Sequence, residues 1–300
     1  MYKFINLDNN QTYNLNSLKA FNYIITDEEI ENIKFINLPE KIENNFLREQ
    51  YTLKKIIFEN CNNVKSIGHN FMTDCESLEN TNFEGLNNLQ SIGDYFMAVC
   101  FSLENPNFEG LNNLQSIGSG FMNSCCSLIN PNFEGLNNLR TIGNIFMADC
   151  GSLKNPKFSG LNNLQSIDDG FMANCESLTN PDFKGLNNLR VIGDYFMSEC
   201  YSLQNPIFKG LNNLQSIGDG FMGSCMSLIN PNFSGLKVLN YLGRDAMVDC
   251  PNIIQNQIDK LYTIAKVGGY NNILSSRILK RNPNLLIPIT TYSGDIIHRK

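Results

Sequence analysis

The feature that most constrains this chain is a cysteine that recurs every 25 residues. Eight of the ten cysteines keep this spacing, at positions 75, 100, 125, 150, 175, 200, 225 and 250. A fixed period of this length is the signature of a stacked repeat, not of one compact domain. The eight regular units cover residues 58–257 of the 300-residue chain.

The apolar residues of each unit recur in the same columns. In residues 83–107 the columns are Phe83, Leu86, Leu89, Ile92, Phe96, Met97, Cys100 and Leu103. A ninth, degenerate unit comes first, because Ile42 and Phe46 lie 25 residues before Ile67 and Phe71. One unit buries too little surface to fold alone, so neighbouring units must cover each other. We therefore predict an N-terminal cap at 1–32, a repeat array at 33–257 and a helical, basic C-terminal cap at 258–300.

The second half of each unit has the apolar spacing of a short helix. Phe96, Cys100 and Leu103 follow the i, i+4, i+7 pattern of one helix face. The column of Asp94 holds Asp, Ser or Asn in most units, and these residues cap helix N-termini. We expect a helix of one to two turns in every unit.

A recurring proline limits the strands. Proline occupies the column of Pro106 from 106 to 231 and has no backbone N–H to donate to a sheet. We expect Pro106 at or just before the first residue of a strand, with pairing confined to about 107–109. A second short extended segment is predicted at Gln90–Ile92.

The pattern Leu89-x-x-Ile92-Gly93-x-x-Phe96-Met97-x-x-Cys100-x-x-Leu103 resembles the BspA-like class of leucine-rich repeats. The resemblance covers about 33–257. It implies an α/β solenoid that is curved, with short parallel strands on one side and short helices on the other. Two departures are that the family's Ala-Phe is Phe-Met here, and that its Ile-x-Ile-Pro strand is replaced by Asn-Pro-x-Phe. Such arrays occur in surface and interaction proteins, and the family has no general catalytic residues.

The repeated cysteine is best explained by packing. Stacked strands lie about 4.8 Å apart, so distance alone permits disulfides between units. Cys100 lies on the apolar face, however, where a free thiol behaves as a small hydrophobic group. A straight ladder also lacks the tetrahedral corners that zinc requires. Cys126, beside the repeated Cys125, is expected to be an exposed thiol.

No other motif predicts catalysis or a cofactor. Gly218–Gly223 matches G-x-G-x-x-G, but other units lack the second or third glycine, so the match is accidental. The two histidines, His69 and His298, have no catalytic partners that the sequence reveals. We predict no metal site, no cofactor and no enzymatic activity. The column of Asn105 is expected to form a ladder of buried amides, with ligand recognition as the alternative.

Charge and hydropathy narrow the partners. The chain has a net charge of −6, with −10 in residues 58–257 and +5 in residues 258–300. An acidic array does not attract nucleic acid through phosphate contacts. No segment has the roughly 18 apolar residues of a membrane span, and the N-terminus does not resemble a secretory signal. We expect an intracellular, cytoplasmic protein that is a monomer.

The functional prediction rests on the variable columns beside the inward-facing Phe108. The column of position 109 changes from acidic to basic along the array, and nearby columns hold apolar residues. The candidate partner-binding face is Glu84, Glu109, Glu134, Lys184, Lys209, Phe101, Tyr201 and Met226. We expect these columns to share the concave sheet face of the solenoid, where they would suit a protein or peptide of complementary charge. Free drift at solvent positions would produce the same variation. Alternatives are a surface or adhesion protein exported by an unrecognised route, and an adaptor with a recruiting motif in residues 1–50.

Overall fold

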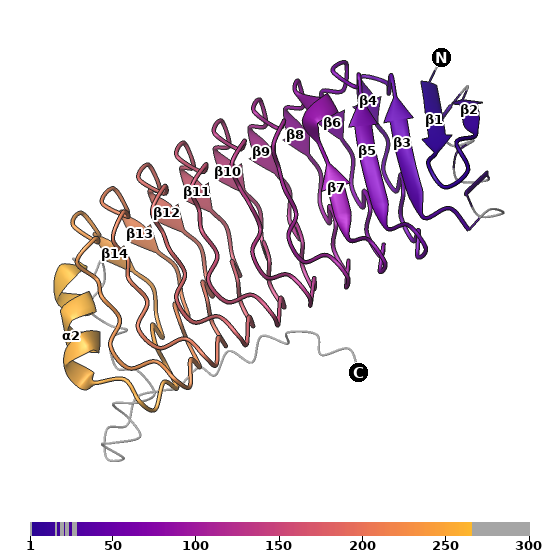
Figure 1. Ribbon diagram of the computed structural model, residues 1–300. Helices are drawn as coiled ribbons and strands as arrows, with labels where there is room; N and C mark the ends of the chain where they lie inside the picture. The colour runs from indigo at the N-terminus through magenta and orange to yellow at the C-terminus, as the bar shows by residue number, and fades with distance from the viewer. Residues whose placement is uncertain (1, 16, 19–20, 22–23, 26–28, 266–300) are drawn as a thin grey trace.

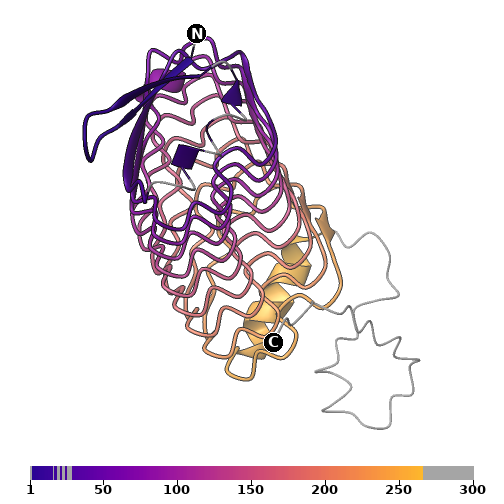
Figure 2. The same cartoon turned by 90° about the vertical axis from the view of Figure 1, so that its right-hand side faces the viewer.

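The computed structural model describes residues 2–15, 17–18, 21, 24–25 and 29–265, which form one elongated stack of rungs (Figure 1). Parallel strands pair between rungs that are 25 residues apart, as Ser116 does with Thr141. Turned by 90°, the stack shows successive rungs tracing nearly the same outline (Figure 2). The molecule is a parallel β-solenoid, which confirms the repeat architecture.

One side of the solenoid is a continuous parallel sheet of nine two-residue strands. In each strand the second residue, such as Ile117, is buried, and the residue before it, such as Ser116, faces outward. The extended segment predicted at Gln90–Ile92 is confirmed as β8. From the N-terminal end the strands are β4 (Lys41–Ile42), β6 (Ser66–Ile67), β8 (Ser91–Ile92), β9 (Ser116–Ile117), β10 (Thr141–Ile142), β11 (Ser166–Ile167), β12 (Val191–Ile192), β13 (Ser216–Ile217) and β14 (Tyr241–Leu242).

A second sheet shrinks where proline enters the repeat. Its parallel strands β3 (Asn32–Ile36) and β5 (Lys55–Glu59) each have five residues, and the next, β7 (Asn80–Asn82), has three. From Pro106 onward only isolated bridges remain, such as that between Asn107 and Asn132. Pro106 lies just before its bridge residue, and its carbonyl accepts the Asn132 N–H at 3.0 Å. The expected position of Pro106 is therefore confirmed. Its column is filled by Ile56 and Thr81 in the longer strands, and the proline ring removes the backbone N–H donor there, which explains why the pairing shortens.

The helices predicted for the repeat units are absent. Residues 58–250, all of which the structure describes, contain no α-helix and one 3₁₀ turn, η1 (Glu84–Leu86). Where a helix was expected, every second residue is left-handed, with φ of 57° at Tyr95, 52° at Met97 and 60° at Val99. This alternation sends N–H groups to neighbouring rungs. The Met97 N–H, for example, donates to the Phe71 carbonyl at 3.0 Å.

The rung spacing explains this correction. A helix with its side chains is about 10 Å wide, whereas hydrogen-bonded rungs advance by about 4.8 Å. Both sides of this solenoid are bonded from rung to rung, so neither side has room for helices. The two sides advance by similar steps: ring centroids are 5.3 Å apart for Phe96 and Phe121 and 5.8 Å apart for Phe108 and Phe133. The stack is therefore nearly straight (Figure 1), not curved as the resemblance implied.

The expected helix caps have a different role. The Asp94 carboxylate accepts the backbone N–H of Ser119 at 2.8 Å, one rung further along. Asp194 accepts the N–H of Asp219 in the same way at 2.7 Å. Asp, Asn and His side chains at this column therefore join consecutive rungs, and the preference for hydrogen-bond acceptors is retained without a helix.

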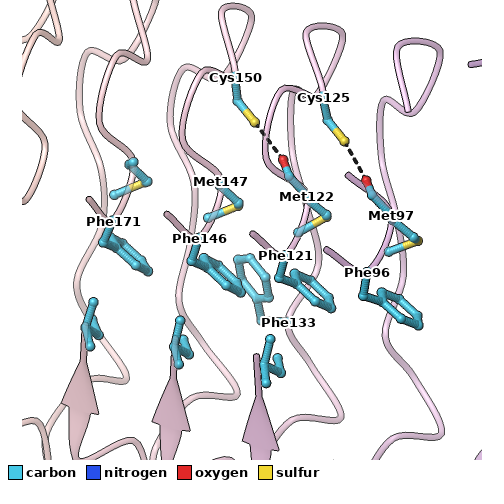
Figure 3. Close-up of a cluster of buried hydrophobic side chains, with 14 of the residues drawn as sticks. Phe96, Met97, Phe121, Met122, Cys125, Phe133, Phe146, Met147, Cys150 and Phe171 are labelled. Carbon is cyan, nitrogen blue, oxygen red and sulfur yellow. Dashed lines mark hydrogen bonds between the residues drawn. The ribbon is translucent and has the colours of Figure 1, made fainter. Parts of the chain in front are cut away.

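Two ladders of phenylalanine fill the core. One runs through Phe96, Phe121, Phe146 and Phe171, whose rings are stacked nearly parallel (Figure 3). The other contains Phe133, which packs at a tilt against Phe146 with centroids 5.9 Å apart. Offset aromatic pairs contribute roughly 0.5–1.5 kcal/mol beyond their buried area. The ladders thus couple each rung to its neighbours.

The repeated cysteines lie beside these rings as free, buried thiols. Each thiol donates to a carbonyl in the preceding rung; Cys125 bonds the Met97 carbonyl at 3.0 Å and Cys150 the Met122 carbonyl at 3.2 Å (Figure 3). The accepting residues have left-handed backbone. The prediction that these cysteines pack in the core is confirmed. The structure shows in addition that each thiol donates a hydrogen bond to a buried carbonyl. Cys126 is exposed, as expected.

Additional elements close both ends of the stack (Figure 1). At the N-terminal end β1 (Tyr2–Asn6) pairs antiparallel with both β2 (Thr12–Leu15) and β3. At the other end α2 (Gln255–Ile264) buries Ile258 and Leu261. β1 covers the edge of β3, which would otherwise be open to another chain, and β2 is the outer strand of that sheet. The predicted helical cap at 258–300 begins within α2, and its part beyond Ala265 lies outside the described residues.

Candidate functional site

The variable residues lie on the side of the solenoid that carries the isolated bridges. We call this side the bridge face and define it by positions 101, 104, 107 and 109 of one rung and their equivalents at intervals of 25. Leu103, Pro106 and Phe108 are buried between these exposed positions. All eight predicted site residues lie on the bridge face and are exposed.

The backbone of the bridge face is held by side-chain hydrogen bonds. The Asn107 carbonyl oxygen, Oδ1, accepts the Glu109 N–H at 3.1 Å, and Asn132 and Asp182 bond Glu134 and Lys184 likewise at 3.0 Å. These bonds fix the turn after each inward phenylalanine. Both the acidic and the basic residues of this column are therefore presented on an ordered backbone.

Charge on the bridge face is separated along the stack. An acidic zone comprises Glu76, Glu79, Glu84, Glu104, Glu109 and Glu134. A basic zone follows and comprises Lys154, Lys157, Lys184 and Lys209. Within the basic zone Glu176 and Asp182 are the acidic members, and Asp182 lies 3.6 Å from the Lys184 ammonium. Glu79, Glu104, Lys154 and Lys157 are additions to the predicted set, detectable in the sequence from the columns of positions 104 and 107.

A third, apolar zone lies at the C-terminal end of the same face. Its members are Tyr201, Ile207, Met226, Ile229 and Ile254, and they are 37–55% exposed. Tyr201 and Met226 occupy the same column in adjacent rungs, as do Ile229 and Ile254, so the zone is continuous from rung to rung. Phe101 is also exposed but lies apart, in a rung that carries Glu104 and Glu109. The structure therefore groups seven of the eight predicted residues into three zones and leaves Phe101 inside the acidic one.

The acidic zone contains a shallow hollow of about 440 Å³. Its lining consists entirely of polar residues: Glu79, Asn80, Ser102, Glu104, Asn105 and Ser127. Asn105 and its equivalents are exposed, so the predicted ladder of buried amides is wrong. A different column forms the amide ladder: Asn138 Nδ2 donates to the Asn112 carbonyl at 2.7 Å, and its equivalents bond likewise. The sequence marks this column only as a turn.

The titratable groups of the described residues form no catalytic arrangement. Burial raises the pKa of Cys75 and of Cys200 to about 12, so both thiols stay protonated near neutral pH. His69 Nδ1 accepts the Asp94 N–H at 3.0 Å and serves the rung-to-rung ladder. Among the described residues no group of three His, Cys, Asp or Glu side chains is placed to hold a metal ion.

The G-x-G-x-x-G match at 218–223 lies in the turn segment of a rung, and no helix follows it there. In the part of the chain that the structure describes, no helix is long and apolar enough to cross a membrane.

The fold and these columns define a leucine-rich-repeat solenoid. The family model described as "BspA type Leucine rich repeat region (6 copies)" matches residues 17–154 and 115–254. The chain therefore belongs to the BspA-type leucine-rich repeat family.

Several solved structures of leucine-rich repeat proteins are similar to this chain. A leucine-rich repeat protein from Bacteroides ovatus is 20% identical with a TM-score of 0.51, and the match covers 75% of this chain and 66%, just under two thirds, of that one. A leucine-rich repeat protein from T. pallidum is 19% identical with a TM-score of 0.44, covering 58% and 84%. A leucine-rich cell surface protein from Faecalibacterium prausnitzii is 13% identical with a TM-score of 0.26, covering 68% and 91%. No curated protein matches the sequence.

Proposed function

We propose that this protein is a non-catalytic interaction protein that binds a protein partner through the bridge face. The observation that carries the proposal is the separation of charge along that face. The core columns are nearly invariant between rungs, whereas the outward column changes from Glu84, Glu109 and Glu134 to Lys184 and Lys209. Clusters of like charge steer a complementary partner and reject others. The exposed apolar zone adds area that a partner can cover.

The closed ends of the stack support a monomer as the binding unit. β1 pairs with the edge of β3, and α2 lies at the other end of the stack. The strands left at the N-terminal edges of the two sheets within the described residues, β2 and β4, have four and two residues, which limits stacking of a second copy. Size-exclusion chromatography with light scattering, over a range of concentrations, tests this part of the proposal. A concentration-dependent dimer contradicts it.

The test of the interaction uses charge reversal at exposed positions. Affinity capture from cells is carried out with wild-type protein, with Lys184→Glu/Lys209→Glu, and with Glu109→Lys/Glu134→Lys. We expect at least one captured protein to be lost with one pair of changes and retained in the control. A suitable control is Glu40→Lys/Lys65→Glu, which exchanges an exposed ion pair (2.8 Å) at the first strands of the nine-stranded sheet. If no captured protein responds to either pair of bridge-face changes, the proposed function is wrong.

We further propose an intracellular location over export to a surface. The cysteine ladder requires reduced thiols, because each S–H donates to a carbonyl, and a disulfide between adjacent rungs removes two donors. Reducing compartments maintain that state. Fractionation of cells that express the native chain tests this location, and recovery only at the cell surface favours the adhesion alternative.

A further inference from the structure

The three zones of the bridge face follow one another in a fixed order along the stack. The acidic zone ends near Glu134, the basic zone extends from Lys154 to Lys209, and the apolar zone extends to Ile254. The apolar zone overlaps only the last rung of the basic zone. A partner that contacts all three zones must therefore extend along the axis of the solenoid, across the rungs.

The length of that partner segment follows from the rung spacing. Glu79 and Ile254 occupy the same column seven rungs apart, which at about 4.8 Å per rung is roughly 34 Å. An extended peptide advances about 3.3 Å per residue, so about ten residues span this distance. Glu109 and Lys184 are three rungs apart, or roughly 14 Å, which corresponds to about four residues of such a peptide.

The hollow in the acidic zone indicates what the first part of the segment carries. Glu79 and Glu104 line it from adjacent rungs, together with the amides of Asn80 and Asn105 and the hydroxyls of Ser102 and Ser127. Two carboxylates about one rung apart, with neutral hydrogen-bonding groups around them, match the donors of a guanidinium group. An acidic side chain at this position would be repelled by the two carboxylates.

We infer that the partner contributes an extended segment of about ten residues, with basic, acidic and apolar residues in that spatial order. Its basic end contacts Glu79, Glu104 and Glu109, its acidic middle contacts Lys184 and Lys209, and its apolar end covers Ile229 and Ile254. This inference rests on the proposed function and names the chemistry of its partner. The segment binds through side chains, because it crosses rungs whose backbone groups already pair with one another.

Two synthetic peptides of identical composition test the order of the zones. The first has blocks of arginine, glutamate and leucine in that order, and the second has the arginine and glutamate blocks exchanged. Fluorescence anisotropy with the full chain measures both. We expect the first peptide to bind about tenfold more tightly, because several exposed pairs, each individually weak, change from attraction to repulsion in the second. This preference should disappear near 1 M salt, where the screening length falls to about 3 Å.

The decisive variant reverses four charges in the column of position 109 while the net charge of the chain is kept. In Glu109→Lys/Glu134→Lys/Lys184→Glu/Lys209→Glu all four positions are exposed, and circular dichroism verifies the fold. The inference expects this variant to lose the preference for the first peptide, because Glu79, Glu104, Lys154 and Lys157 keep their charges and both zones become similar in net charge. The variant Glu40→Lys/Lys65→Glu keeps the wild-type preference. With the wild-type protein, failure of both peptides to bind or equal binding of the two overturns the inference. An unchanged preference for the first peptide in the four-fold variant also overturns it.

This outcome is separable from that of the proposed function. If affinity capture responds to charge reversal but the peptides show no order preference, the face binds a partner of another shape, and only the extended segment is wrong. If neither experiment responds, both the segment and the function are wrong.

Discussion

Replacement of Cys150 separates two roles that a buried thiol has in this fold: filling space and donating a hydrogen bond. Cys150 is fully buried, and its thiol donates to the Met122 carbonyl at 3.2 Å. In residues 29–265, no backbone N–H donates to that carbonyl. Without the thiol it becomes a buried acceptor with no partner, at a cost of about 1–3 kcal/mol. Loss of the buried sulfur in Cys150→Ala adds roughly 0.5–1.5 kcal/mol.

The two roles predict opposite orders for Cys150→Ser and Cys150→Val. Serine keeps a donor and loses apolar volume, whereas valine fills the space and has no donor. If the hydrogen bond matters as the geometry indicates, the serine variant is the more stable and loses about 1 kcal/mol, while alanine loses about 2–4 kcal/mol. If the site requires only packing, valine is close to wild type and serine is the least stable of the three.

Urea unfolding followed by circular dichroism measures these differences. The slope of each transition must match wild type for the midpoints to be compared, because repeat arrays can unfold in more than one step. The matched control is Cys126→Ser, at an exposed cysteine in the preceding rung, where a change within about ±0.5 kcal/mol is expected. A valine variant as stable as wild type, with serine below alanine, would refute the role of the thiol as a donor.

Three further changes test other parts of the structure by the same unfolding assay. Thr81→Val removes the Thr81 hydroxyl, which is buried without a hydrogen-bond partner, and should stabilise the protein by about 1 kcal/mol; a loss of stability means that the hydroxyl is bonded. Val99→Asn replaces a β-branched residue at a φ of 60° and should gain about 1 kcal/mol, as Asn174 already occupies the equivalent position at 55°; no gain argues against the left-handed turn. Burial, together with the charges of Asp169 and Asp219, raises the pKa of Asp194 above its value of 3.8 in the unfolded chain. The charged carboxylate therefore destabilises the fold at pH 7. This destabilisation is lost as the pH falls to below 3.8, where the carboxyl is protonated in both states. Asp194→Asn keeps the acceptor for Asp219 and should gain on the order of 0.2–1 kcal/mol at pH 7 and almost nothing near pH 3; an equal gain at both pH values contradicts the electrostatic cause.

Much of the architecture is readable from the sequence because stacking repeats every requirement of one rung. A column that is apolar in eight rungs must face the core, so the burial of Phe96, Cys100 and Phe108 follows from periodicity alone. The position of Pro106 before its bridge follows from its missing N–H. The same columns identify the family to which the chain belongs.

The turn segment was mispredicted because apolar spacing does not report backbone handedness. Phe96, Met97, Cys100 and Leu103 are all buried, as on one side of a helix, although Tyr95, Met97 and Val99 have left-handed backbone. The N–H groups that would close helical turns donate to residues about 25 positions away. Local patterns contain no information about such partners. The buried amide ladder was wrong for a related reason, because Asn105 and Asn113 are equally repeated and only packing shows which one bonds the neighbouring rung.

The sequence by itself determined the 25-residue rung, the residues that face its core, and the change of charge along position 109. Only the tertiary structure decided that the rungs have no helices, that each thiol donates to a carbonyl of the preceding rung, and that the variable columns are exposed beside isolated bridges instead of a continuous sheet. The physical reason is that a rung closes its hydrogen bonds only on its neighbours. A rung is bonded on both sides at the spacing of a β-sheet, and that spacing determines the turns, the straight axis and the face on which the variable side chains meet.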